Sequence, residues 1–285
     1  CACLVGSEMC IRDRRLGSNF RKNEDLNDYL VRNHIPGIQG IDTRALTKLL
    51  RNDGCMNGMI TTHKYEVSEV IDKIKAFKVQ GVVKACTCKE KHTVGTGRMK
   101  VALYDFGAKR NIANELAKRN CEVTVFPATT PASEVLEGNF DGIMLSNGPG
   151  DPAEVTDIIA EVKKLSESGM PIFAICLGHQ LMALAHGFKT EKLKYGHHGA
   201  NHPVKDLDTN RVYISTQNHN YVIKDDSIDP AVAKAWFRNV NDGTIEGVEY
   251  LNKNIKTVQF HPEANAGPRD TEYLFDEFIK MMEGK

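Results

Sequence analysis

From residue 99 onward, short apolar runs alternate with amphipathic segments. Runs rich in β-branched and other apolar residues cover 100–105, 121–126, 142–146 and 172–175, and their length and composition predict buried strands. Between them, apolar residues recur three and four positions apart over 111–119, 131–137 and 155–167, as in helices that cover a core. This alternation predicts a mostly parallel, doubly wound α/β sheet with helices on both faces.

The pattern continues to the carboxyl terminus with shorter pieces. A helix is expected over 180–186, antiparallel strands over 231–237 and 246–250, another strand over 255–260 and a terminal helix over 271–282. Ligands of such sheets bind beyond the carboxyl ends of the strands. Ser146, Cys176 and His261 all fall at such ends, so we expect the functional site there.

The chain before residue 99 has a different organisation. Residues 1–14 resemble a translated sequencing adapter and lack the regions of a signal peptide, so we expect them to be non-native. Residues 15–83 predict the remnant of a truncated, smaller α/β domain, and 84–98 lack a periodic pattern and predict a linker to a domain over 99–285. Within 15–83 the expected elements are helices over 24–30, 43–50 and 67–77 and a strand over 54–62.

Composition narrows the classes of function. The chain has 285 residues, and its 37 Lys and Arg residues balance its 37 Asp and Glu residues. This balance gives no overall field that would attract nucleic acid or an anionic membrane. No apolar run reaches the length that spans a bilayer. The eight cysteines lack paired CxxC spacing and are typical of reduced thiols, so we expect a cytoplasmic protein without membrane or nucleic-acid partners.

Cys176 stands at the end of the apolar run over 172–175 and directly before a predicted helix. Small residues at Ala174 and Gly178 flank it, which is typical of a nucleophile elbow where strand and helix approach closely. The helix N-terminus favours a thiolate, and the Leu177 N–H points to where an oxyanion would form. Cys176 is therefore the candidate nucleophile.

A second segment supplies a base for that nucleophile. Residues 258–263 predict a short strand that ends in His261-Pro262-Glu263, and the two-residue period of a strand places His261 and Glu263 on one face. Cys176, His261 and Glu263 can then act as nucleophile, base and orienting group. Each residue alone is more often structural, whereas the elbow and this motif together favour catalysis.

With these motifs the chain resembles the class I, or triad, glutamine amidotransferases, whose fold is flavodoxin-like. Their elbow has a glycine where this chain has Ala174. Within that family it resembles the small, glutamine-hydrolysing subunits of carbamoyl-phosphate synthetases. The matching segments are Leu145–Pro152, Gly196–Pro203, Gln217–His219, and His261–Ala264 with Gly267, Pro268 and Asp270, together with Asp42-Thr43-Arg44 in the first domain.

The resemblance implies the function and the site. It implies that L-glutamine is hydrolysed through a cysteine thioester and that the ammonia passes to a carbamoyl-phosphate synthetase large subunit. That subunit would use ATP, Mg²⁺ and bicarbonate, in arginine and pyrimidine biosynthesis, so no cofactor is expected in this chain. The glutamine-binding residues carried over from the family are Gly148, Gly150, Leu177, Gln180, Asn218, Asn220 and Tyr221. The Gly148 N–H is a second candidate oxyanion donor.

Two further points complete these expectations. No residue of this chain matches a serine with which the family's first domain contacts glutamine, so we expect the chain to bind glutamine weakly. The histidine-rich segment Gly196–His202 has no acidic or cysteine neighbours in sequence, so we expect no metal there and favour a structural or interface role.

Three alternatives remain open from the sequence. The chain could be the glutaminase subunit of another class I amidotransferase, such as those of anthranilate or GMP synthesis, which would lack Asp42-Thr43-Arg44 and the segment Gly196–Pro203. It could be a non-catalytic regulatory subunit, against which the three triad residues argue. It could also be a cysteine hydrolase that needs no partner for full turnover.

Overall fold

The fold is described from a computed structural model that covers residues 22–61 and 63–284. The expectation that residues 1–14 are non-native falls outside this part of the chain. The chain divides into two compact units, with the boundary between Lys78 and Val79. We describe each unit by itself.

The described part of the first unit consists of three helices joined by irregular segments. They are α1 (Leu26–Arg32), α2 (Thr43–Asp53) and α3 (Val67–Ala76). The Asp42 side chain caps α2 by accepting a hydrogen bond from Ala45 N at 2.9 Å, and Glu66 and Glu69 form a capping box at α3. The strand predicted over 54–62 is wrong for residues 54–61, which pair with no described strand.

The second unit is built on one ten-stranded sheet with the order β1-β3-β2-β4-β5-β10-β9-β8-β6-β7. Strands β3, β2, β4, β5 and β10 run parallel to one another, and the remaining pairs are antiparallel. The strands are β1 (His92–Val94), β2 (Met99–Asp105), β3 (Cys121–Pro127), β4 (Gly142–Leu145), β5 (Ile172–Ile175), β6 (Thr190–Asp206), β7 (Val212–Ile223), β8 (Ala233–Asn239), β9 (Ile245–Tyr250) and β10 (Ile255–Val258).

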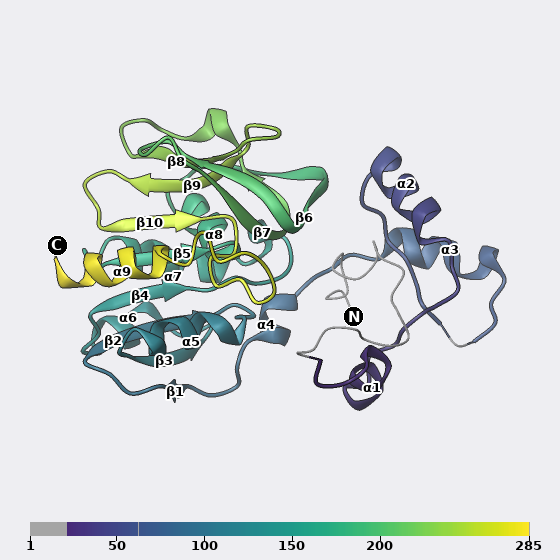
Figure 1. Ribbon diagram of the computed structural model, residues 1–285, viewed down its shortest axis with the longest axis horizontal. Coiled ribbons are helices and arrows are strands. Elements are labelled where there is room, and N and C mark those ends of the chain that lie inside the picture. The colour runs from purple at the N-terminus through teal and green to yellow at the C-terminus, as the bar shows by residue number, and fades with distance from the viewer. Residues whose placement is uncertain (1–21, 62, 285) are drawn as a thin grey trace. The chain divides into compact units, whose positions relative to one another are not determined.

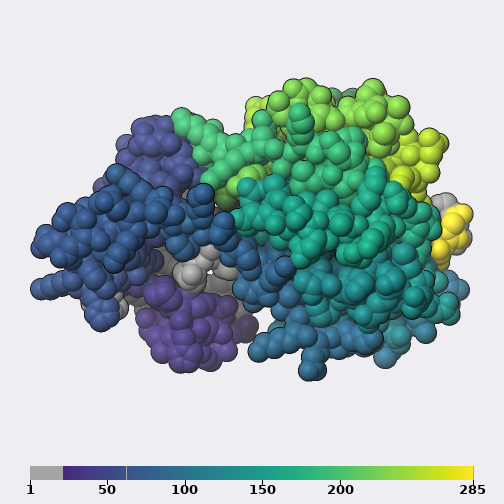
Figure 2. All heavy atoms as spheres, turned by 180° about the vertical axis from the view of Figure 1, so that it is seen from behind, coloured from purple at the N-terminus to yellow at the C-terminus, as the bar shows by residue number. Residues whose placement is uncertain are grey.

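Helices cover both faces of the parallel strands (Figure 1). The described helices of the second unit are α4 (Val82–Cys86), α5 (Arg110–Lys118), α6 (Ala132–Leu136), α7 (Thr156–Ser166), α8 (Leu177–Ala185) and α9 (Leu274–Glu283), and its short 3₁₀ turns are η2 (Pro152–Glu154) and η3 (Asp225–Ser227). Figure 2 shows the side opposite to Figure 1, where the teal atoms around α7 form the surface. In the described residues, no helix combines the length and the apolar character needed to cross a membrane.

The two-residue period of the strands creates two cores, one on each face of the sheet. Along β2, Ala102 and Tyr104 pack with α6, α7 and α8, whereas Val101 and Leu103 pack with α5 and α9. Both sets are almost fully buried. The predicted doubly wound α/β fold is therefore confirmed, as is the antiparallel pairing of the strands expected over 231–237 and 246–250.

Two regions differ from the elements expected from the sequence. The histidine-rich segment Gly196–His202, for which the sequence predicted no strand, belongs to β6, which forms a long hairpin with β7. Its pattern lacks apolar alternation because much of this hairpin is exposed and its register shifts twice, between Lys192 and His197 and between Gly199 and His202. The segment 84–98, expected as a linker, holds the end of α4 and strand β1, which pairs with β3.

We predict that Phe278→Ala destabilises the second unit by about 3–5 kcal/mol. Phe278 is fully buried in the core on the α9 side, with its ring centroid 6.0 Å from that of Phe173. Urea unfolding followed by the fluorescence of Trp236, the single tryptophan, reports on this same core. The control Leu207→Ala, at a side chain that is 40% exposed, should cost under about 1 kcal/mol. Equal costs for the two variants would contradict this account of the core.

Candidate active site

Cys176 joins β5 to α8 in a strained backbone conformation. Its backbone angles, φ 53° and ψ −102°, lie outside the regions that residues other than glycine adopt easily. Its N–H donates to Val258 O at 2.8 Å, and Gly178 N donates to Ser146 O at 3.0 Å. A Cβ on Gly178 would lie 2.6 Å from Leu145 O, so the close approach of helix and strand requires glycine there. The predicted nucleophile elbow is thus formed.

The structure brings His261 and Glu263 together beside this elbow. His261 Nδ1 lies 2.7 Å from Glu263 Oε1, and both residues and Cys176 are at most 4% exposed. The sequence predicted that a strand would place His261 and Glu263 on one face, and this is wrong. Strand β10 ends at Val258, and both residues lie in the turn that follows. Two backbone bonds set this turn, from His261 N to Thr216 O at 2.9 Å and from Ala264 N to His261 O at 3.1 Å.

Neighbouring charges shift the pKa values of His261 and Glu263. Burial disfavours the imidazolium of His261, but the charges of Glu263 and Cys176 outweigh it and raise the pKa of His261 to about 9. A side-chain hydrogen bond with Cys176 adds to this shift. Burial opposes ionisation of Glu263 as well, yet His261 and Lys109 hold the pKa of this carboxyl below its usual value. His261 can therefore exchange a proton with Cys176 while Glu263 stays ionised.

Two residues that the sequence analysis missed support Glu263. Lys109 Nζ lies 3.3 Å from Glu263 Oε1, and the Asn111 side-chain amide donates to Glu263 O. Both come from the start of α5, more than 140 positions away in the chain, and nothing in the local pattern marks them. The Asn147 side chain accepts from Lys109 N at 2.9 Å, which ties this segment to the loop after β4.

The two candidate oxyanion donors lie close together. A Cβ on Gly148 would lie 2.3 Å from Phe106 O and 2.6 Å from a methyl carbon of Leu177. The loop after β4 can pass this near to the start of α8 only with glycine at position 148. The structure therefore places both residues at the elbow, and their donation to an oxyanion stays a prediction.

The remaining candidate glutamine contacts come from neighbouring segments. The Gln180 side-chain nitrogen donates to Tyr221 O at 2.8 Å and to Gln259 Oε1 at 2.9 Å, which joins α8 to β7. Burial raises the pKa of Tyr221 to about 12, and a hydrogen bond with the Asp151 carboxylate adds to this effect. Strand β7 therefore also contacts the loop that holds Gly150.

Asn218 and Asn220 are held by one histidine of the facing strand. His198 Nδ1 lies 2.9 Å from Asn218 Oδ1, and His198 Nε2 lies 3.2 Å from Asn220 Oδ1. The seven residues expected to bind glutamine thus lie on three adjoining segments, namely the loop after β4, the start of α8 and strand β7. Binding itself stays a prediction.

Comparisons with known proteins agree with this geometry. The family profile described as "Glutamine amidotransferase class-I" matches residues 102–281, and "Carbamoyl-phosphate synthase small chain, CPSase domain" matches residues 3–60. The carbamoyl phosphate synthase small chain of Clostridium perfringens is 48% identical over 92% of this chain and 74% of its own length. The small chain of Salmonella typhimurium is 45% identical over 96% of this chain and 78% of its own length.

A solved structure supports the fold alone. A protein from Thermoplasma acidophilum described as a "putative gmp synthase subunit a protein" superposes with a TM-score of 0.58 at 22% identity. The superposition covers 65% of this chain and 94% of that protein.

We predict that Glu263→Gln lowers the pKa of His261 below about 9, because burial would then act without the opposing carboxylate. The change is measured by ¹⁵N NMR of the imidazole, with the His261→Asn spectrum identifying the resonance. The surface variant Asp208→Asn, which breaks only an exposed ion pair with Lys234, should leave the midpoint unchanged.

The raised pKa of His261 makes the free energy of unfolding depend on pH. Because the folded-state pKa of His261 lies above its ordinary value of 6.5, the stabilisation by the His261–Glu263 pair is complete below about pH 6.5 and is lost as pH rises through about 9.

In the NMR titration, an imidazole midpoint that stays at about 9 in Glu263→Gln would show that Glu263 does not set the titration of His261.

Proposed function

Because this chain belongs to the class I glutamine amidotransferases, and within them to the carbamoyl-phosphate synthase small chains, we propose that it hydrolyses the side-chain amide of L-glutamine to glutamate and ammonia. The observation that carries this proposal is the buried His261–Glu263 pair beside the strained Cys176 elbow. A complete triad is not needed for a purely regulatory role. The relatives' names and the match over residues 3–60 favour this branch over the anthranilate and GMP enzymes.

The first half of the reaction forms a covalent intermediate. The Cys176 thiolate attacks the carboxamide carbon of glutamine, and the carbonyl electrons move to oxygen, where the Leu177 and Gly148 N–H groups stabilise the charge. Each such donor typically contributes about 10²–10³ in rate. When the tetrahedral intermediate collapses, the C–N bond breaks and the His261 imidazolium gives its proton to the departing nitrogen. The products are ammonia and a γ-glutamyl thioester on Cys176.

The second half releases glutamate. His261, now neutral, takes a proton from a water molecule that attacks the thioester carbon. The C–S bond breaks, and Cys176 returns to its starting state. Glu263 transfers no proton and orients the imidazole in both halves. Lys109 and Asn111 in turn fix Glu263, so they act as positioning residues.

Ammonia released at neutral pH becomes ammonium, which is not a nucleophile. We therefore propose that the chain works in a heterodimer with a carbamoyl-phosphate synthetase large subunit, which uses the ammonia with ATP, Mg²⁺ and bicarbonate. In this proposal the glutaminase chain itself needs no cofactor for its reaction. Its setting is the reducing cytoplasm, which keeps the Cys176 thiol available, and its product serves arginine and pyrimidine synthesis.

We predict that Cys176→Ser abolishes glutamine-dependent carbamoyl phosphate synthesis in the complex with the large subunit, by roughly 10³-fold or more, because a serine hydroxyl is a far poorer nucleophile here. Synthesis from added ammonia should remain largely intact, since that half-reaction uses the other subunit. The matched control Cys55→Ser, at an exposed cysteine of the first unit, should keep both activities. Retained glutamine-dependent activity in Cys176→Ser would remove Cys176 from the mechanism.

We also predict a graded response within the triad. His261→Asn removes the proton carrier and should eliminate nearly all glutaminase turnover, whereas Glu263→Gln removes only its orienting partner and should leave a measurable remainder. Steady-state ammonia release gives kcat for both variants. Equal losses in the two would mean that Glu263 does more than orient the imidazole.

A further inference from the structure

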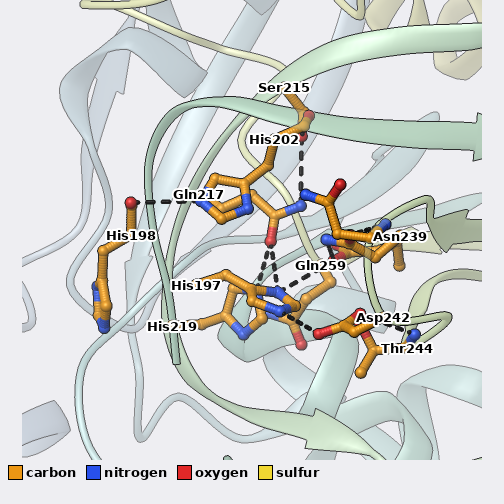
Figure 3. A network of polar contacts seen from close by, with 12 residues as sticks. His197, His198, His202, Ser215, Gln217, His219, Asn239, Asp242, Thr244 and Gln259 are labelled. Carbon is orange, nitrogen blue, oxygen red and sulfur yellow. Dashed lines mark hydrogen bonds and ion pairs between the residues drawn. The ribbon is translucent and has the colours of Figure 1, made fainter. Parts of the chain in front are cut away.

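Strands β6, β7 and β9 bring together a second group of buried polar side chains (Figure 3). One ligand atom from each of His197, His219 and Glu246 lies within 4.8 Å of the others, and all three residues are buried. Gln217 adds a fourth atom, because its Oε1 lies 3.1 Å from His197 Nδ1 and 2.7 Å from His219 Nε2. Four residues with lone-pair atoms therefore lie close together.

Both ring nitrogens of His197 face acceptors only. Its Nε2 lies 2.7 Å from Asp242 Oδ2, and its Nδ1 lies 3.3 Å from Glu246 Oε1 as well as facing Gln217. The Asp242 carboxylate fixes one N–H at Nε2. Nδ1 then needs a cation, which can be either a second proton or a metal ion.

Both ring nitrogens of His219 also face acceptors, and a second proton is a less favourable way to satisfy them than a metal ion. Its Nδ1 lies 2.9 Å from the carbonyl oxygen of Tyr221, and its Nε2 faces Gln217 Oε1. A neutral imidazole carries one N–H, so one of these two contacts joins two acceptors. Protonating both His197 and His219 would place two imidazolium rings with their centroids only 4.9 Å apart. Some other positive charge is needed between His219 and Gln217.

The orientation of the Gln217 amide does not remove this conflict. The Ser215 hydroxyl donates its only proton to His202 O at 2.9 Å. Ser215 Oγ can therefore only accept from Gln217, whose side-chain nitrogen lies 3.3 Å away. The amide nitrogen is fixed toward Ser215, and the amide oxygen stays aimed at the two histidines.

We propose that His197 Nδ1, His219 Nε2, Glu246 and Gln217 Oε1 bind one divalent transition-metal ion of the Zn²⁺ type. Tetrahedral zinc with bonds of about 2.0–2.2 Å holds neighbouring ligand atoms about 3.3–3.6 Å apart. The separations from His197 Nδ1 to Glu246 Oε1 and to Gln217 Oε1 are 3.3 and 3.1 Å, whereas the 2.7 Å between His219 Nε2 and Gln217 Oε1 would lengthen when the ion binds. The second nitrogen of each histidine donates to a carboxylate or a backbone carbonyl, which is the usual outer support of a metal-bound imidazole.

Charge also balances in this arrangement. The Glu246 and Asp242 carboxylates carry two negative charges, which one divalent ion neutralises. Glu246 is fully buried, and its Oε2 has no hydrogen-bond partner in the part of the chain that the structure describes. Asn239 Nδ2 donates to Glu246 Oε1 at 3.0 Å, and Thr244 fixes Asp242 through two hydrogen bonds. The four protein ligands close the site, so its role is structural.

The expectation of no metal rested on the lack of acidic neighbours in sequence. The fold supplies them from β9 and from the turn before it, more than 40 positions along the chain from His197. The metal would fix β6 and β7 against β9, next to the strand positions of Asn218 and Asn220.

The test measures metal directly. The full chain is loaded with Zn²⁺, dialysed against metal-free buffer and assayed by inductively coupled plasma mass spectrometry. We expect about one zinc per chain. In Glu246→Gln, which keeps the shape and removes the charged ligand, zinc affinity should fall by about 100-fold or more. The matched control Glu249→Gln, in the same strand but paired with Lys234 at the surface, should retain the ion.

If Glu246→Gln does not fold, a second variant and a spectroscopic probe still test the proposal. Asp242→Asn alters only the outer support, and its side chain is 43% exposed, so it should fold and bind zinc about 10–100-fold more weakly. Co²⁺ in place of Zn²⁺ should give a tetrahedral spectrum without a thiolate charge-transfer band. No retained zinc in the unsubstituted chain, equal retention in Glu246→Gln and Glu249→Gln, or a thiolate band would each overturn the proposal.

Discussion

The backbone conformation of Cys176 is the constraint on which the rest of the site depends. Holding a residue other than glycine at φ 53° and ψ −102° costs on the order of 1–3 kcal/mol and persists only when its surroundings determine it. Here the Cys176 N–H is bonded to β10 through Val258 O, and the next turn is bonded to the end of β4 through Ser146 O. The central parallel strands thus fix the proposed nucleophile, and their packed cores on both faces offset the strain.

The antiparallel half of the sheet holds His261, the proposed base. The chain leaves β10 after Val258, and His261 N then donates to Thr216 O of β7, so the imidazole proposed as the base is held by the antiparallel strands. Its partner Glu263 is buried, and a buried carboxylate persists only when it is paired. His261 and Lys109 provide that pairing from two directions. The active site is therefore a meeting point of the parallel and antiparallel parts of one sheet.

The sequence predicted what depends on local pattern. Buried parallel strands such as β4 and β5 are continuous apolar runs, and the small residues around Cys176 report the close packing of the elbow. Long-range contacts left no such signal. Lys109 supports Glu263 across more than 150 positions, and the polar, half-exposed hairpin of β6 and β7 has no apolar alternation. For the same reason, the convergence of His197 with Glu246 appears only in the fold.

The account requires that a glutamyl group be carried on Cys176 during turnover. The direct test mixes the chain with glutamine, quenches with acid within the first turnovers and maps the adduct by peptide mass spectrometry. The account predicts a labile glutamyl thioester on the peptide that contains Cys176, absent from the same peptide of Cys176→Ser. Sustained ammonia release with no adduct on Cys176, or with an adduct on another cysteine, would contradict it.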